Sequence, residues 1–426
     1  MTERQPLAPL LAALLLWIAS LPCVAKTHGS DSIRHYGFKI DVAPGRIICM
    51  DQWQKKWQRN KQSTSIGFEI NHSALPSDSN AYSRDYNYPS FNYGLRLSLN
   101  DVTMHRDPDP AWGYAEEVDY DSRLGNIVTA YTTFTRPLLR TKHWTLDYLL
   151  GSGIGYGKHK YSPGNNIDNE LTGSRFLIYF VAGAHATYRV TRDWGLTAGL
   201  EFFHHSNGAL NRPNKGANVI TPVVGIRYMP YYEETLRRPH TTAQKDTEQP
   251  RVGHWFSKIT IGTGGKTLNE DWQLTQFNTP PDSARYRTSR FHFYTAYSLQ
   301  ADILYRYARR WASGIGADLF YGTYANHVKQ LDQAAGIDLP HSPWSFGLAA
   351  KHHAYYNRLY LNMAVGVYLY RHMGQNAKEI EKPYYERIGV NYAFPKLGNL
   401  SIGFNVKAHL TKADLTEIVV SYPISH

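Results

Sequence analysis

The chain has no long apolar run and only two cysteines. No apolar stretch approaches the roughly 18 residues that a membrane-spanning helix requires, and mean hydropathy is low at -0.46. Two cysteines, Cys23 and Cys49, are too few for the disulfide framework of a small secreted scaffold or for a cysteine-based zinc site. These absences exclude helical membrane proteins, disulfide-stapled domains and cysteine-zinc folds.

The first 25 residues predict a secretory signal peptide. A basic residue precedes an apolar run from Leu7 to Ala19, and the small residue Ala25 offers a cleavage site. The surroundings of Cys23 are a poor context for lipid attachment. Cleavage after Ala25 would leave Cys49 as the only cysteine of an exported chain.

Aromatic residues and positive charge are abundant. The chain holds 32 Tyr, 16 Phe, 10 Trp and 33 Gly, and its net charge is +11. Tyr, Trp and Gly in an exported chain without apolar helices favour an outer-membrane β-barrel. The positive charge then faces anionic lipid head groups and phosphates. We expect no nucleic-acid partner, because no basic helix or recognised binding motif accompanies the charge.

Apolar residues alternate with polar or small ones in blocks of about ten residues, as transmembrane strands require. From Leu359 to Leu369 every second residue is apolar, and Leu400 to Leu410 repeats the pattern. Charges such as Lys407 and Arg189 on the other face must then point into a lumen. A soluble β-sandwich with one buried face is the alternative. Sixteen segments show the pattern: 36–42, 64–72, 92–102, 126–134, 144–156, 176–190, 194–206, 219–228, 255–263, 291–307, 312–324, 344–355, 359–371, 386–394, 400–410 and 415–424.

The predicted fold is an all-β, transmembrane, antiparallel outer-membrane β-barrel of about 12–16 strands. Eight segments precede the polar stretch 232–252, which is a long loop or a seam, and eight follow it. A single large barrel avoids two separate closures and is favoured; two eight-stranded halves are the alternative. The domains expected are a signal peptide at 1–25, a barrel portion at 26–231, the loop or seam, and further strands at 253–426. Polar stretches at 73–90, 103–124 and 268–288 are expected to be external loops.

One segment carries candidate catalytic chemistry. His204 and Ser206 are two residues apart on a predicted strand, so both project from the face that carries Leu200 and Phe202. A histidine base and a serine hydroxyl on the lipid-facing side of a barrel suggest a lipid substrate. Asn218 lies at the base of the next predicted strand, 219–228, and a hairpin could bring it beside His204 to orient the ring. Further candidates for the oxyanion or the site geometry are Asn207, Asn214, Gly208 and Gly216.

The pattern His-x-Ser-Asn-Gly followed by Pro-Asn-x-Gly-x-Asn, over residues 204 to 218, resembles the signature of the outer-membrane lipid A 3-O-deacylases and their acyloxyacyl-hydrolase-like relatives. The resemblance is specific over 204–218, loose over 90–230 and absent beyond 250. It implies a β-barrel that removes an ester-linked hydroxyacyl chain from lipid A at its lipid-facing wall. It also implies that His204 is the base and Ser206 the nucleophile.

The chain departs from the best-described members of that family at one position. They carry Glu where this chain has Asn218. An amide can orient a histidine but does not supply the negative charge that stabilises imidazolium. Either another triad variant operates, activity is slower, or the third residue lies elsewhere. Glu201 is close in sequence, but its parity points it into the lumen.

Rival functions remain open at this point. A passive porin or structural barrel has no reason to carry the 204–218 segment, and acyl transfer between lipids could use the same serine. Adjacent histidines at 204–205 and 352–353 face opposite ways on a strand, so neither pair chelates a metal. Carboxylates at 107, 109, 116, 117, 119 and 121 are hard-ion ligands and allow a calcium-dependent lipid ester hydrolase. We expect lipid A or lipopolysaccharide as the substrate, outer-membrane lipids as surroundings, and no metal or cofactor.

Overall fold

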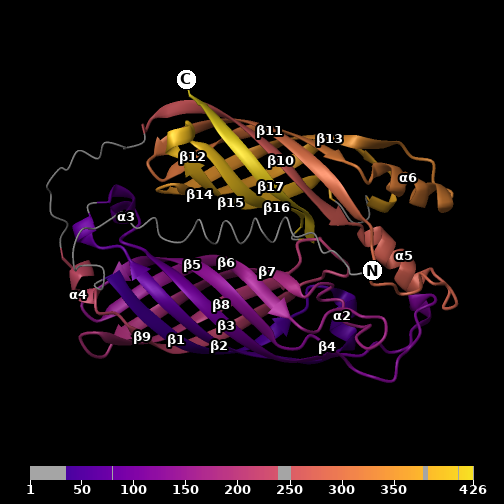
Figure 1. The fold of residues 1–426 in the computed structure, drawn as a ribbon, viewed down its shortest axis with the longest axis horizontal. Helices are drawn as coiled ribbons and strands as arrows, with labels where there is room; N and C mark the ends of the chain where they lie inside the picture. Colours follow the sequence, from indigo (N-terminus) through magenta and orange to yellow (C-terminus); the bar gives the residue numbers. More distant parts are fainter. Residues whose placement is uncertain (1–34, 79, 238–250, 378–381, 411, 426) are drawn as a thin grey trace. The chain divides into compact units, whose positions relative to one another are not determined.

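The computed structural model describes residues 35–78, 80–237, 251–377, 382–410 and 412–425. The first half of the chain closes into an eight-stranded antiparallel barrel (Figure 1). Its strands follow the order β2-β1-β9-β8-β7-β6-β5-β3, pairing of β2 with β3 closes the ring, and the two-residue β4 extends β3. The strands are β1 (Tyr36–Ile48), β2 (Gln58–Ser73), β3 (Ser90–Met104), β4 (Ser122–Arg123), β5 (Ile127–Arg140), β6 (Trp144–Gly157), β7 (Phe176–Arg189), β8 (Trp194–Ser206) and β9 (Ala217–Tyr228).

The second half forms its own closed barrel in the order β10 to β17, with β10 pairing β17. These strands are β10 (His254–Thr267), β11 (Phe293–Ala308), β12 (Trp311–Gly322), β13 (His341–Tyr356), β14 (Leu359–Met373), β15 (Tyr384–Phe394), β16 (Leu400–His409) and β17 (Lys412–Ser425). Every neighbour pairing in both barrels is antiparallel.

The all-β transmembrane barrel predicted from the sequence is therefore confirmed, in the form of two eight-stranded halves. The single larger barrel that the sequence favoured is not formed, because each half finds its closing partner within itself. In the first barrel β1 pairs with β9, for example Val42 with Val224. In the second, Ile259 of β10 pairs with Tyr422 of β17. The predicted leader, 1–25, lies outside the described residues.

Short helices sit in the connections between strands. They are α2 (Gln52–Trp57), η2 (Pro76–Asp78), α3 (Ala81–Asp85), η3 (Pro110–Trp112), α4 (Tyr232–Thr235), α5 (Asn269–Phe277), α6 (Ala325–Ala334) and η4 (Pro395–Leu397). Among the residues described, none of the helices has the length and apolar character to span a membrane.

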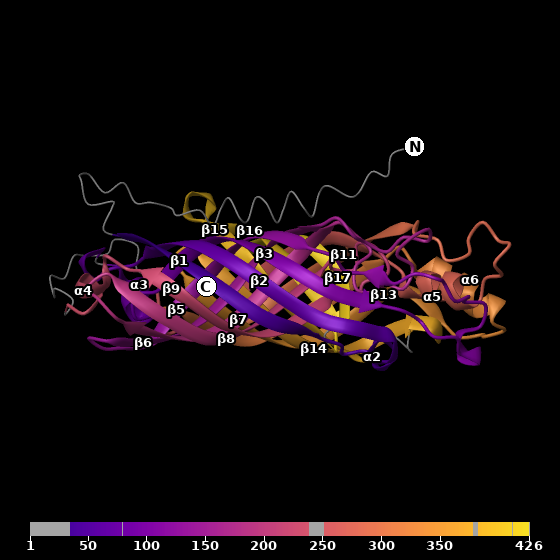
Figure 2. The ribbon, with the colours of Figure 1, turned by 90° about the horizontal axis from the view of Figure 1, so that it is seen from below.

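The two ends of the first barrel differ. One end carries the connections 49–57, 105–126, 158–175 and 207–216, and we name it the long-loop end. The opposite end carries the tight turns 141–143 and 190–193, together with η2 and α3. The stretch 73–90, expected to be an external loop like 103–124, therefore lies at the other end of the barrel from it. Strands β1 and β2 cross the wall obliquely between these ends (Figure 2), as barrel closure requires. In outer-membrane barrels the longer loops face the outside.

Charged side chains fill both lumens. In the first barrel Arg96 pairs with Glu201 at 2.7 Å, and Lys39 pairs with Asp41 at 3.0 Å. In the second, Lys351 pairs with Asp318 at 2.6 Å, and Arg387 with Glu417 at 3.0 Å. Arg96 and Arg387 are fully buried. Such interiors, as far as the described residues show them, do not provide the open channel that a passive pore needs.

Apolar side chains cover the outside of the walls, as the alternation predicted. Val365, at the middle of β14, exposes 62% of its surface. We expect Val365→Arg to destabilise the membrane-inserted fold by roughly 2–4 kcal/mol, because a charge at mid-membrane faces hydrocarbon. Ile424→Arg, near the end of β17, should cost about 0–1 kcal/mol. Denaturant unfolding in lipid vesicles measures both, and equal costs would contradict the assignment of the wall to lipid.

Candidate functional site

Strands β8 and β9 bring the predicted site residues to one wall. The two strands are antiparallel neighbours, and their register places His204 directly opposite Asn218. Residues of even number on β8 point outward, since Leu200 and Phe202 expose 53% and 42% of their surfaces. On β9 the same holds for Ile220, at 42%. His204, Ser206 and Asn218 therefore belong to the outer wall, at the long-loop end of the strands.

The His204 ring is held by an amide. Its Nδ1 lies 2.7 Å from Oδ1 of Asn218, and the ring is half-buried. With Oδ1 as the acceptor, Nδ1 carries the ring proton and Nε2 keeps its lone pair. This is the tautomer in which Nε2 can take a proton from a hydroxyl.

Ser206 is the last residue of β8 and has 5% of its surface exposed. Two residues along a strand separate its Cα from that of His204 by roughly 6.6 Å. Within the described residues no hydrogen bond joins the Ser206 hydroxyl to the His204 ring. Hydrogen bonds between a nucleophile and its base are often long before substrate binds. The structure thus brings His204 and Asn218 into contact and leaves Ser206 as their neighbour on the same face.

Gly216 gives the His204 ring its space. Its φ of +75° is in the left-handed region, and a Cβ on this residue would collide with Cε1 of the His204 ring. Gly208, after Ser206, has a φ of +63°. Glycine is the residue that adopts such backbone without strain. Both glycines therefore allow the chain to turn tightly around the site.

We expect Gly216→Ala to displace the His204 ring and to lower activity by about 100-fold, the order of loss that follows a misplacement of about 1 Å in a reacting group. Gly164→Ala is a suitable control, because that glycine lies in a connection at the same end and a Cβ there meets nothing within 4 Å. Initial rates of hydrolysis of a long-chain acyl ester measure the effect. Full activity of Gly216→Ala would contradict this packing.

Asn207 and Asn214 are joined to each other. The backbone N–H of Asn207 donates to Oδ1 of Asn214 at 2.8 Å, and the side-chain amide of Asn207 donates to Ser174 Oγ at 3.2 Å. The oxygen of Asn214 thus holds the chain just after Ser206. Its side-chain NH₂ is the donor that remains for a substrate.

An ionic cluster, consisting of Asp51, Arg106, Glu170 and Lys215, fixes the turn before β9; Arg106 and Glu170 are buried, and Lys215 and Asp51 are partly exposed. Nζ of Lys215 lies 2.6 Å from Glu170 and 3.0 Å from Asp51. Arg106 binds the other oxygen of Glu170 at 2.5 Å, and its guanidinium lies over the Trp57 ring. Backbone bonds from Lys215 N to Glu170 O and from Gly216 N to Leu171 O add to the attachment. Burial alone would lower the pKa of Lys215, but Glu170 and Asp51 raise it above its usual value, so the amine is charged.

Sequence reasoning did not find this cluster. Lys215 lies inside the motif but had no assigned role, and Asp51 is 164 residues away from it. Arg106 and Glu170 are separated by 64 residues. No local pattern marks such long-range partners. The only signal was the position of Lys215 between Asn214 and Gly216.

Other candidates are used elsewhere. Glu201 is in the lumen, bound to Arg96 at 2.7 Å and to His185 at 3.0 Å, as its parity predicted. In the acidic loop, Asp107 pairs with Arg59, and His105 lies 3.5 Å from Glu117. Among the described residues no group of three or more His, Cys, Asp or Glu is placed to hold a metal ion.

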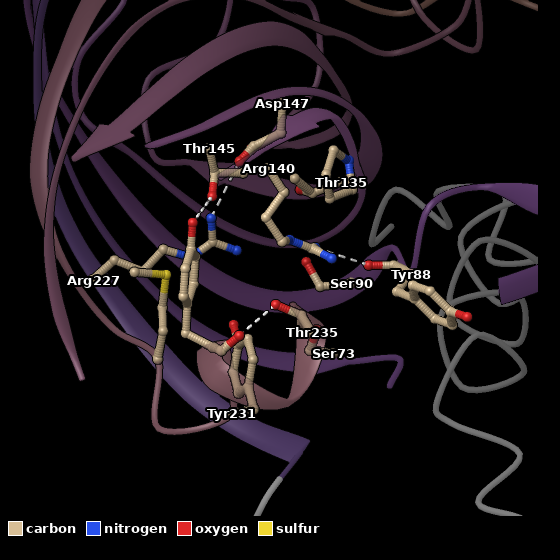
Figure 3. A pocket seen from close by; sticks show the side chains of 13 residues that line it. Ser73, Tyr88, Ser90, Thr135, Arg140, Thr145, Asp147, Arg227, Tyr231 and Thr235 are labelled. Carbon is tan, nitrogen blue, oxygen red and sulfur yellow. Dashed lines mark hydrogen bonds and ion pairs between the residues drawn. The ribbon is translucent and has the colours of Figure 1, made fainter. Parts of the chain in front are cut away.

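A small cavity, whose lining residues Figure 3 shows, lies among residues at the short-turn end of the first barrel. Its volume is about 20 Å³, and its lining includes Asp147, Arg227 and Tyr231. Arg227 and Asp147 form an ion pair at 3.4 Å there. A water molecule needs about 10–15 Å³. The cavity therefore holds about one water and is too small for a larger ligand.

Comparison with known proteins gives two family matches. Residues 49–227 match the family model of lipid A 3-O-deacylase, and residues 255–426 match that of acyloxyacyl hydrolase, C-terminal domain. The resemblance therefore extends beyond residue 250, where the sequence alone had shown none. Among solved structures, the outer membrane enzyme PagL is 12% identical, covering 44% of this chain and 97% of its own, with a TM-score of 0.27. The toluene transporter TodX of Pseudomonas putida is 11% identical, covering 92% and 89%, with a TM-score of 0.18. No curated protein matches the chain.

Proposed function

Because the chain belongs to the lipid A 3-O-deacylase family, we propose that it hydrolyses an ester-linked acyl chain of lipid A in the outer membrane, with Ser206 as nucleophile and His204 as base. The observation that carries the proposal is the contact between His204 Nδ1 and Asn218 Oδ1 at 2.7 Å, on the outer wall beside Ser206. A base, its orienting group and a hydroxyl on a lipid-facing surface suit a substrate that arrives from the bilayer.

The chemistry is a two-step acyl transfer to water. Ser206 Oγ attacks the ester carbonyl while its proton passes to His204 Nε2. The tetrahedral intermediate collapses, the sugar oxygen leaves with the proton from His204, and the acyl chain stays on Ser206. Water, deprotonated by His204, then releases the chain as a free fatty acid. The protein is thus a carboxylic ester hydrolase that needs no cofactor.

The oxyanion needs donors close to Ser206. The Asn214 side-chain NH₂ is the first candidate, because its oxygen is already fixed by the Asn207 N–H at 2.8 Å. Asn207 supports this geometry through Ser174. Gly208 and Gly216 supply the tight backbone around both amides.

The domain assignment completes the proposal. The signal peptide 1–25 directs export and is removed, the portion 26–231 carries the deacylase site, and 232–252 connects it to the strands of 253–426. The long-loop end faces outward, so His204 and Ser206 lie at the depth of the lipopolysaccharide head groups. Lipid A is the substrate, and the surrounding outer-membrane lipids contact the wall.

Asn218 orients His204 without contributing charge. We expect Asn218→Ala to lower the deacylation rate less than loss of His204 does, because the ring loses only its orientation. Asn218→Glu should retain or raise the rate, since a carboxylate opposite His204 would also stabilise the imidazolium. Rates on lipid A micelles measure both. A faster enzyme after Asn218→Ala would contradict the assigned role.

The test is the mass of lipid A from cells with and without this protein, repeated with Ser206→Ala. We expect loss of one hydroxyacyl mass with the native chain and none with Ser206→Ala. Ser152→Ala is the matched control, because Ser152 is exposed on β6 of the same barrel, and it should leave deacylation intact. Unchanged lipid A mass with the native, folded protein would refute the proposal.

A further inference from the structure

The outer wall of the second barrel carries a second serine and histidine in contact. On β12, Ala312 is fully buried and Ile315 exposes 69% of its surface, so odd-numbered residues point outward. On β13, His353 is buried at 1% and Leu348 is exposed at 47%, so even-numbered residues point outward. Ser313 and His352 therefore share the outer wall, and the strand register pairs them directly.

The two side chains are hydrogen-bonded. Oγ of Ser313 lies 2.8 Å from Nδ1 of His352. The Trp311 ring stacks on the His352 ring, with centroids 5.3 Å apart and an angle of 29°. The Arg310 guanidinium lies over Trp311 at 5.4 Å. The ring plane of His352 is thus fixed from one side, and a positive charge lies nearby.

The surroundings are apolar. On the side away from the turn, the next outward-facing residues are Ile315 on β12 and Ala350 on β13. Val365 of β14 pairs with Ala350 and is exposed at 62%. Ala350 and Ala354 flank His352 on its own face, and Met363 of β14 lies opposite His352 in the strand register. An ionisable group on the outer wall of a membrane barrel is a candidate for function.

The pair lies near one rim. Ser313 is the third residue of β12, which follows the two-residue connection 309–310. In outer-membrane barrels the short turns face the periplasm. That leaflet of the outer membrane consists of glycerophospholipid, and an arginine beside Trp311 suits its phosphate.

We propose that Ser313 and His352 form a second acyl-ester hydrolysis site, which acts on glycerophospholipids from the leaflet at the short-turn rim. Ser313 Oγ attacks the acyl carbonyl, and its proton moves to His352 Nδ1. The glycerol oxygen leaves with that proton, which gives acyl-Ser313 and a lysophospholipid. Water, deprotonated by His352, then releases the fatty acid. The site uses neither His204 nor Ser206 and is independent of the deacylation proposed for the first barrel.

The experiment uses the full chain with Ser206→Ala, reconstituted in vesicles of phosphatidylethanolamine and phosphatidylglycerol without lipid A. We expect release of lysophospholipid and fatty acid. Ser313→Ala should reduce it to the vesicle background, and His352→Gln should reduce it by about 10²–10⁴-fold, the usual contribution of a general base. Ser342→Ala, a partly exposed serine at the other end of β13, should leave the release unchanged.

Three outcomes would overturn the proposal. One is the absence of release from vesicles that contain the folded protein, as judged by its heat-modifiable migration. Another is release that persists in both Ser313→Ala and His352→Gln. The third is fatty acid release that is the same with and without Ser206→Ala and that disappears only when His204 is replaced as well. Because lipid A is absent from the vesicles, none of these results depends on the activity of the first barrel toward lipid A.

Discussion

Replacing His204 with alanine should lower lipid A deacylation by about 10³–10⁶-fold, the loss seen when the base of a serine hydrolase is removed. The reason is that the Ser206 hydroxyl is a weak nucleophile unless a neighbouring base takes its proton. Asn218 holds the His204 ring at 2.7 Å with its second nitrogen available. The rate of fatty acid release from purified lipid A in detergent micelles measures the effect.

The control is His159→Ala, because His159 is an exposed histidine in a connection at the same end of the barrel. It should keep the native rate. Both variants should retain the heat-modifiable migration of a folded barrel. A His204→Ala rate within about tenfold of the native rate would show that another group acts as base.

Glu170→Gln should produce the second large effect, on both stability and rate. Glu170 is fully buried and binds Arg106 at 2.5 Å and Lys215 at 2.6 Å. Removing its charge takes one carboxylate away from each of two cations, while Lys215 still lies 3.0 Å from Asp51 and Arg106 lies 3.6 Å from Asp168. Loss of one partner of a buried ion pair costs about 3–5 kcal/mol. The turn that contains Gly216 is attached to this cluster, so kcat should fall by about 10–100-fold while KM for lipid A changes little.

Denaturant unfolding and steady-state kinetics separate the two effects. Glu117→Gln is the control, since Glu117 is half-exposed and forms only a long contact with His105 at 3.5 Å. Glu170→Asp should recover part of the kcat, because it restores the charge. A loss of stability with unchanged kcat would mean that the cluster holds the loops together without positioning the site.

The strands could be predicted from sequence because their signal is local. Each of the sixteen predicted segments overlaps a strand, and Val365 and Lys407 point outward and inward as their parity required. Only β4, with two residues, was missed. The closure was not predicted, because the choice between one ring and two depends on whether β1 meets β9 or a later strand. That choice is made by contacts between distant parts of the chain.

The candidate site, like the fold, could be predicted from the sequence only in part. The shared face of His204 and Ser206 follows from the two-residue period, and the approach of Asn218 follows from the hairpin that joins β8 to β9. The ion pair between Glu170 and Lys215 does not follow from the spacing of residues in the sequence. The hydrogen bond between Ser313 and His352 on neighbouring strands does not follow from it either. Both depend on register and loop packing, which only the folded barrel defines.

Covalent trapping shows whether Ser206 is the nucleophile on the lipid-facing wall of the first barrel. The native protein in lipid micelles is treated with a long-chain alkyl fluorophosphonate, digested and analysed by peptide mass spectrometry. We expect an adduct on Ser206 that forms in step with loss of deacylation and does not form in His204→Ala. Complete loss of deacylation with Ser206 unmodified, or full deacylation with Ser206 fully modified, would contradict it.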